Sequence, residues 1–146
     1  MLNPSDGDRN IIGATITQLL KAIENINELR NYGELTVTNL LSNKTSMPNK
    51  LNNIIYDQQN LDNDEYLMNE IEFSDIIILA CGDIYNHVYT NNTKNLLLIQ
   101  LKRIIDIADN NNKQIYCLDL NKNGTPRHPR FFSFKTILNH ELIPYN

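Results

Sequence analysis

The sequence predicts a single α/β domain over residues 1–146, built as a three-layer sandwich with a mainly parallel central sheet. Three observations predict it. Segments with helical spacing of apolar residues alternate with short β-branched runs, which is the pattern of β-α-β crossovers. The run at residues 76–81 is continuously apolar, as in a central parallel strand buried on both faces. A chain of 146 residues supports one modest core and is too short for two.

The N-terminal half contains a turn, a helix, a strand and a long loop. We interpret residues 1–2 as the last residues of a strand whose beginning is absent, and residues 3–5 as a turn fixed by its proline. Apolar residues at helical spacing predict a helix over 15–29. The β-branched run at 34–41 predicts a strand, and residues 42–53 form a polar loop.

The C-terminal half repeats the alternation of helices and strands. We predict a short helix over 63–71, a central strand over 76–81, and a second clear helix over 93–108. The next strand covers 114–120, and a short helix is expected near 136–140. The carboxyl ends of these strands therefore carry the turns in which ligand contacts are common in open α/β sheets.

Charge and composition limit the classes of partner. The net charge is −4 and the pI is about 5.3, whereas a non-specific nucleic-acid coat protein is normally basic. One local basic cluster contains Lys122, Arg127, Arg130 and Lys135. It could bind a phosphate of a nucleotide or nucleic acid, or be an ordinary solvated face, and the sequence leaves both readings open.

Several classes of site are not predicted. Cys81 and Cys117 lie in apolar runs, which favours buried free thiols over a disulfide. The sequence has no dinucleotide, P-loop or zinc motif, and its histidines are dispersed, so we expect no cofactor and no metal. It has no apolar run long enough to cross a membrane and no signal peptide, so we expect a soluble cytoplasmic protein without a membrane partner.

Four features fall at predicted carboxyl ends of strands: Asn3, Asn39, Gly82 and the turn at residues 126–129. Parallel strands end at one edge of a sheet, so we expect these features to converge. Within the turn, prolines stiffen the loop around His128, and a rigid neutral imidazole can donate one hydrogen bond to a developing oxyanion. The alternative is a surface histidine and an asparagine that merely forms a turn.

These segments also resemble, in order, domain-of-unknown-function family 1643, which occurs in bacteria and phages. The segments are Met1-Leu2-Asn3-Pro4-Ser5, Ala14-Thr15-Ile16, Gly33, Val37-Thr38-Asn39-Leu40, Ala80-Cys81-Gly82 and Gly124-Thr125-Pro126-Arg127-His128-Pro129. The resemblance covers nearly the whole chain and implies a family without an established activity.

The chain more distantly resembles the uracil-DNA glycosylase fold superfamily, which implies a sandwich of that type. Through this resemblance, Asn3 and Pro4 would orient an attacking water, and Asn39 would read the edge of a base. His128, followed by a proline, would stabilise the oxyanion of the departing base, as the histidine of a His-Pro motif does in that superfamily. The segment at residues 79–82 resembles the end of a central strand there.

Chemistry assigns the remaining site residues. An amide can position a water but is a poor base, so Asp8 is expected to take the proton, with Asp6 as the alternative. Ser5 and Gly82 are expected to contact the substrate, and so are two basic residues near the histidine, Arg127 and Arg130.

Two functions remain open at this point. The first is a nucleobase- or nucleotide-handling protein, such as an N-glycosidic hydrolase that acts on a modified or flipped base, as DNA glycosylases do. The second is a non-catalytic binding or interaction protein of phage or viral origin that retains the fold. The oligomeric state is not predicted.

Overall fold

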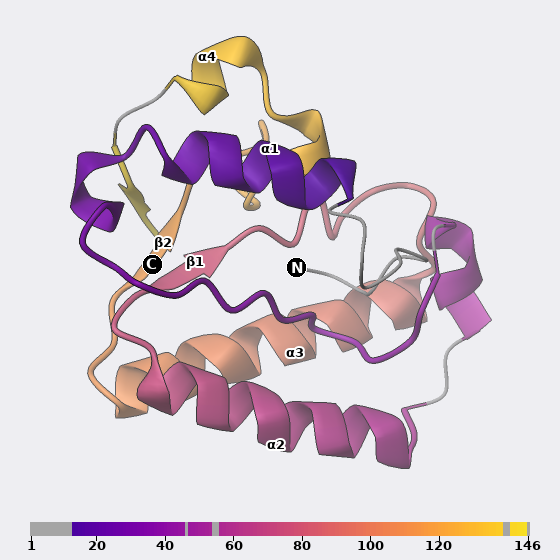
Figure 1. The fold of residues 1–146 in the computed structure, drawn as a ribbon. Helices are drawn as coiled ribbons and strands as arrows, with labels where there is room; N and C mark the ends of the chain where they lie inside the picture. The colour runs from indigo at the N-terminus through magenta and orange to yellow at the C-terminus, as the bar shows by residue number, and fades with distance from the viewer. Residues whose placement is uncertain (1–12, 46, 54–55, 139–140, 146) are drawn as a thin grey trace.

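A small mixed sheet of three strands lies between the helices (Figure 1). Its strands are β1 (Ile77–Leu79), β2 (Ile115–Cys117) and β3 (Ile143–Pro144), in the order β1-β2-β3. The β1–β2 pair is parallel and the β2–β3 pair is antiparallel. The predicted α/β class is confirmed. The sheet, however, is mixed rather than mainly parallel in the part that the structure describes.

The structure is a computed structural model that describes residues 13–45, 47–53, 56–138 and 141–145. Its α-helices are α1 (Ala14–Ile23), α2 (Gln58–Phe73), α3 (Asn91–Asn110) and α4 (Phe134–Ile137), and its 3₁₀ turns are η1 (Asn27–Leu29), η2 (Pro48–Asn53) and η3 (Pro129–Phe131). Among these described residues, no helix is both long enough and apolar enough to cross a bilayer.

Capping side chains set where the helices begin. The Asp57 carboxylate accepts the Asn60 N–H at the start of α2, so this helix begins five residues before the predicted position. Thr90 caps α3 and Ser133 caps α4 in the same way. The predicted helix at 136–140 therefore exists as the shorter α4, and residues 139–140 lie outside the described part.

The first helix is shorter than its apolar spacing predicts. It ends at Ile23, and Ile26 adopts an extended conformation before the turn η1. Ile26 and Leu29 are nevertheless buried. A break and a 3₁₀ turn can thus keep both side chains in the core, which is why apolar spacing alone did not reveal the end of the helix.

Residues 34–41 were predicted to form a strand, and the described structure assigns no strand there. The predicted β-branched run lacks a partner: residues 34–37 make no backbone hydrogen bond to any described residue. Strand propensity does not by itself supply the neighbour that a ladder requires. The predicted strand is therefore wrong for the described part of the chain, because this segment does not pair with the sheet.

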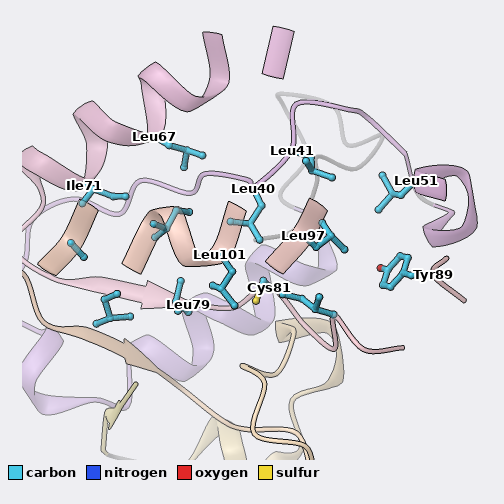
Figure 2. Packing of buried hydrophobic residues seen from close by; sticks show 14 residues of the cluster. Leu40, Leu41, Leu51, Leu67, Ile71, Leu79, Cys81, Tyr89, Leu97 and Leu101 are labelled. Atoms are coloured by element: carbon cyan, nitrogen blue, oxygen red, sulfur yellow. The ribbon is translucent and has the colours of Figure 1, made fainter. Parts of the chain in front are cut away.

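Alternating side chains of β1 enter two hydrophobic clusters. Ile77 and Leu79 pack with α2 and α3, in the cluster shown in Figure 2. Ile76, next to the strand, and Ile78 pack with α1 in the second cluster, together with Leu118 after β2. In Figure 1, α2 and α3 accordingly lie on one side of the sheet, and α1 and α4 lie on the other. The prediction of a parallel strand that packs on both faces is confirmed. The strand is shorter than the predicted 76–81, however, and it lies at an edge of the described sheet and not at its centre.

Candidate functional site

The turn that follows β2 is held closed by its own backbone. Leu120 and Pro126 form an antiparallel bridge, and the Asn121 N–H donates to the Thr125 carbonyl at 2.8 Å. Gly124 takes a φ of 80°, and its N–H donates to the Asn121 carbonyl at 2.9 Å. This hairpin explains why the Asn-Gly pair stands here, because glycine adopts positive φ without strain. The hairpin therefore fixes the position of the backbone from which Arg127 and His128 extend.

Gly82 joins this turn to the carboxyl end of β1. Its N–H donates to the Pro126 carbonyl at 2.9 Å, and its φ is 92°. A Cβ atom at this position would stand 3.1 Å from the Cβ of His128 and 3.8 Å from its Cγ. The two predicted site residues are therefore in direct contact, and glycine is required both by the backbone conformation and by the imidazole beside it.

The ring nitrogens of His128 have different roles. Nδ1 accepts a hydrogen bond from the Arg130 N–H at 3.2 Å, and so caps η3. A nitrogen that accepts cannot carry the proton, so the neutral ring carries it on Nε2. Among the residues that the structure describes, none accepts a hydrogen bond from this Nε2. His128 thus presents one donor that no described residue uses.

Burial keeps this imidazole neutral. Desolvation, together with the nearby Arg130 charge, lowers the pKa of His128 from 6.5 to about 4. Phe131 shields the ring further, with ring centroids 6.3 Å apart in an edge-on arrangement. At neutral pH the side chain is a neutral hydrogen-bond donor and not a cation.

Arg127 is directed to a different partner. Its guanidinium donates to the Asp119 carboxylate at 2.8 Å, and the Thr136 hydroxyl donates to the same oxygen at 2.7 Å. These side chains line a small pocket of about 300 Å³ beside α4. Asp119 was not predicted as a site residue, and the only available signal was its place just after β2. Arg130 and Lys122 are exposed.

Asn39 carries an unmatched polar atom. Its Oδ1 is buried and has no hydrogen-bond partner in the described part, while its backbone carbonyl accepts from Asn63 at 3.1 Å. Three residues later, the Ser42 Oγ is also buried and unpartnered. Buried polar atoms are rarely left unpaired, so such a pair indicates a place where a ligand or water completes the bonding. Ser42 has no motif by which the sequence could reveal it.

The neighbours of Asn39 and Gly82 in the sequence both enter the core. Leu40 and Cys81 belong to the buried cluster that Figure 2 shows. The described structure thus places Gly82 and His128 in contact at the carboxyl end of β1. Asn3, Pro4, Ser5 and Asp8, with the alternative base Asp6, lie outside the described residues.

The family model described as "Protein of unknown function (DUF1643)" matches residues 1–130. The chain belongs to this family. No curated protein and no solved structure matches the chain. The DUF1643 match includes both turns and ends at the last residue of the His128 turn, Arg130, so it covers every predicted site residue and leaves out α4 and β3.

The thiols of this DUF1643 member are unsuited to chemistry. Cys81 and Cys117 are free and buried. Burial raises the pKa of both, that of Cys117 to about 11 with further help from Asp119. A thiol of high pKa is a poor nucleophile and a poor metal ligand. Among the described residues, no group of three His, Cys, Asp or Glu side chains could hold a metal ion.

Proposed function

We propose that this chain handles nucleobases or nucleotides, and that its leading activity is hydrolysis of the N-glycosidic bond of a modified or flipped base. One observation carries the proposal: His128 is a neutral, rigid Nε2–H donor packed on Gly82 at the end of β1. A donor already held where negative charge develops stabilises that charge without reorganisation during the reaction.

Hydrolysis replaces the base by water at the anomeric carbon of the sugar. A water oxygen forms a bond to that carbon while the bond from the carbon to the base nitrogen breaks. The electron pair moves into the base, and its carbonyl oxygen becomes the oxyanion that His128 Nε2–H would stabilise. In the proposal Asn3 orients the water and Asp8 accepts its proton. The base leaves as an anion and takes up one proton from solvent, to which Asp8 later returns its own, so the products are a neutral base and a sugar hydroxyl.

Base recognition falls to Asn39 in this proposal. Its buried Oδ1 lacks a donor, and an N–H on the edge of a base would supply one. An analogue without that N–H would leave the oxygen buried and unpaired, which sites of this kind reject strongly. Pro4 and Ser5 are proposed to line the same site, and Lys122, Arg127 and Arg130 to contact the phosphates of a nucleotide or of DNA.

We also propose the finer fold: a three-layer sandwich of the uracil-DNA glycosylase type. The two hydrophobic clusters on opposite sides of β1 support it, since a sandwich requires helices against both faces of the sheet. A fold-level likeness does not by itself supply the activity. The function therefore depends on the site and not on the fold.

Base release is the test. Single-stranded DNA, duplex DNA and free nucleotides with deaminated or alkylated bases would be incubated with the protein, and released base quantified by chromatography. We expect His128→Asn to lower the rate by about 10²–10³-fold, since the asparagine can still cap η3 but has no group at the Nε2 position. His128→Gln should retain part of the rate because its amide N–H reaches further. Lys102→Ala, an exposed change on α3, is the matched control.

A second candidate is a non-catalytic interaction protein of phage or viral origin. It is favoured by the Arg127–Asp119 ion pair, which already neutralises one of the basic residues near His128, and by the net charge of −4. If no substrate is cleaved, and Asn3→Ala and His128→Ala both leave base and nucleotide binding unchanged, this candidate replaces the first. It predicts a partner that the His128→Ala protein still captures.

A further inference from the structure

A deep groove lies beside β1, on the side opposite β2. It encloses about 870 Å³. Residues 32–38 form one wall, residues 74–80 with β1 form the other, and α1 contributes Leu19 and Ile23. In Figure 1 the segment that follows η1 runs along β1 in the same direction as the strand. The groove thus separates two extended stretches of chain.

Each wall contains a stretch of backbone without a ladder partner among the described residues. β1 bonds only to β2, so its other edge has no ladder partner in the described chain. The opposite wall is equally open, because residues 34–37 make no backbone hydrogen bond to any described residue. An unpaired edge is a ready template for an added strand. An added strand lying between these two open edges could therefore form backbone hydrogen bonds on both sides.

The side chains around the groove suit an apolar strand. Ile76 and Ile78 line it from the β1 side and Val37 from the other. Large apolar side chains are also left exposed at its walls: Tyr32 is 43% exposed, Leu35 42% and Phe73 83%. Exposed apolar side chains at the walls of one groove are a common feature of interaction surfaces.

Charge defines one end of the groove. Glu34, Glu70 and Asp75 line it, and none of the described lining residues is a lysine or an arginine. Desolvation, Glu70 and then Glu34 raise the pKa of Tyr66, so both carboxylates lie within electrostatic range of this phenol. Asp75 lies just before β1, while the Ser74 carbonyl at the end of α2 already accepts a hydrogen bond from the Lys113 ammonium at 2.7 Å. The carboxylates of Glu34 and Asp75 are therefore the groups that a basic residue of a ligand would meet at this end.

We propose that the groove is a strand-binding site for another polypeptide. Its occupant is an extended segment of five or six apolar, β-branched residues with a lysine or arginine at its N-terminal end. That segment would run parallel to β1, pair with its open edge, and place the basic residue near Asp75 and Glu34. Wall residues 33–38 span about 17–20 Å in extended form, which fits a strand of this length. The site is independent of His128.

A synthetic peptide tests the proposal. The probe is Lys-Val-Ile-Val-Ile-Thr with a fluorophore at its C-terminus, titrated into the full chain and followed by anisotropy. We expect saturable one-to-one binding, and loss of binding when the central valine is replaced by proline, which removes a ladder N–H. Hydrogen exchange should slow at residues 76–80 with the probe and not with the proline peptide.

Charge reversal separates this site from simple stickiness. The double variant Glu34→Lys with Asp75→Lys should bind the lysine probe about tenfold more weakly, and bind a glutamate-headed version better than the unmodified protein does. Asp106→Lys, exposed on α3 and outside the groove, is the matched control and should change neither. Both acidic positions are exposed, so these variants should fold.

Three results would overturn the proposal. The first is no binding at about 1 mM probe. The second is equal binding of the valine and proline peptides, which would indicate an apolar ligand cleft and not a strand site. The third is a dimer that protects residues 76–80 without any peptide, which would make a second copy of the chain the occupant.

Discussion

Replacing Gly82 with alanine tests the junction on which the candidate site depends. Gly82 has a φ of 92°, where an L-residue is strained by about 1–2 kcal/mol. The new methyl group would also stand 3.1 Å from the Cβ of His128, a backbone-anchored atom that cannot swing away. Crowding of this kind adds about 1–2 kcal/mol. We therefore expect Gly82→Ala to lower the free energy of unfolding by about 2–4 kcal/mol.

Gly124 provides the matched control. It has a φ of 80°, and nothing lies within 4 Å of the position of its Cβ. Gly124→Ala should therefore cost only the backbone strain of about 1–2 kcal/mol. Urea unfolding, followed by circular dichroism, would give both values. If the two variants lose the same stability, the Gly82–His128 contact contributes nothing and the reasoning fails.

Three further predictions concern buried groups. Because the folded pKa of His128 is about 4 against 6.5 unfolded, the unfolded chain binds more protons between these values, so stability should fall as the pH drops from 6.5 to 4. After discounting for partial exposure, we expect the free energy of unfolding to fall by about 1–2 kcal/mol over this pH range, and not to fall in this way in His128→Asn. If urea unfolding gives the same dependence on pH for both proteins, the prediction is wrong. Asp64 is 3% exposed and bonds to Arg103 and Tyr56, so Asp64→Asn should lower the free energy of unfolding by about 2–3 kcal/mol. The exposed change Asp62→Asn should lower it by less than about 0.5 kcal/mol. If thermal unfolding shows similar losses for the two variants, the ion pair of Asp64 does not stabilise the fold. Native Cys81 and Cys117 should react with a disulfide reagent at pH 8 far more slowly than in denaturant, and rapid native labelling would show that they are not buried.

The sequence revealed those parts of the fold that depend on local pattern. The apolar run at 76–81 predicted β1 with two buried faces, and helical spacing at 93–108 located the core of α3. It did not reveal the helix starts set by the Asp57 and Thr90 caps, since serine, threonine and aspartate also occur throughout the loops. The antiparallel β3 was missed because two residues carry no periodicity.

The 34–41 segment shows where pattern reasoning ends. Its composition favours an extended chain, and residues 34–37 make no backbone hydrogen bond to any described residue. Pairing depends on what lies alongside, which neither β propensity nor alternation contains. For the same reason the groove could not be predicted from the sequence, because it forms only where this segment and β1 lie side by side.

The candidate site was predictable in part. The order of strands and turns indicated that Gly82 and His128 would share an edge, and the structure places them in contact. The direction of Arg127 was not predictable, since neighbouring side chains in an extended turn point to opposite sides and its partner Asp119 is set by tertiary packing. The buried oxygens of Asn39 and Ser42 likewise emerge only from three-dimensional burial.

Nitrogen NMR of the His128 imidazole tests the central claim most directly, namely that this side chain is a neutral donor through Nε2. We expect a neutral ring at pH 7 with the proton on Nε2 and none on Nδ1, and no titration until the pH approaches about 4. His87, which is exposed, serves as the internal comparison. A His128 ring that carries its proton on Nδ1, or that titrates near 6.5, would show that His128 is not a neutral Nε2 donor.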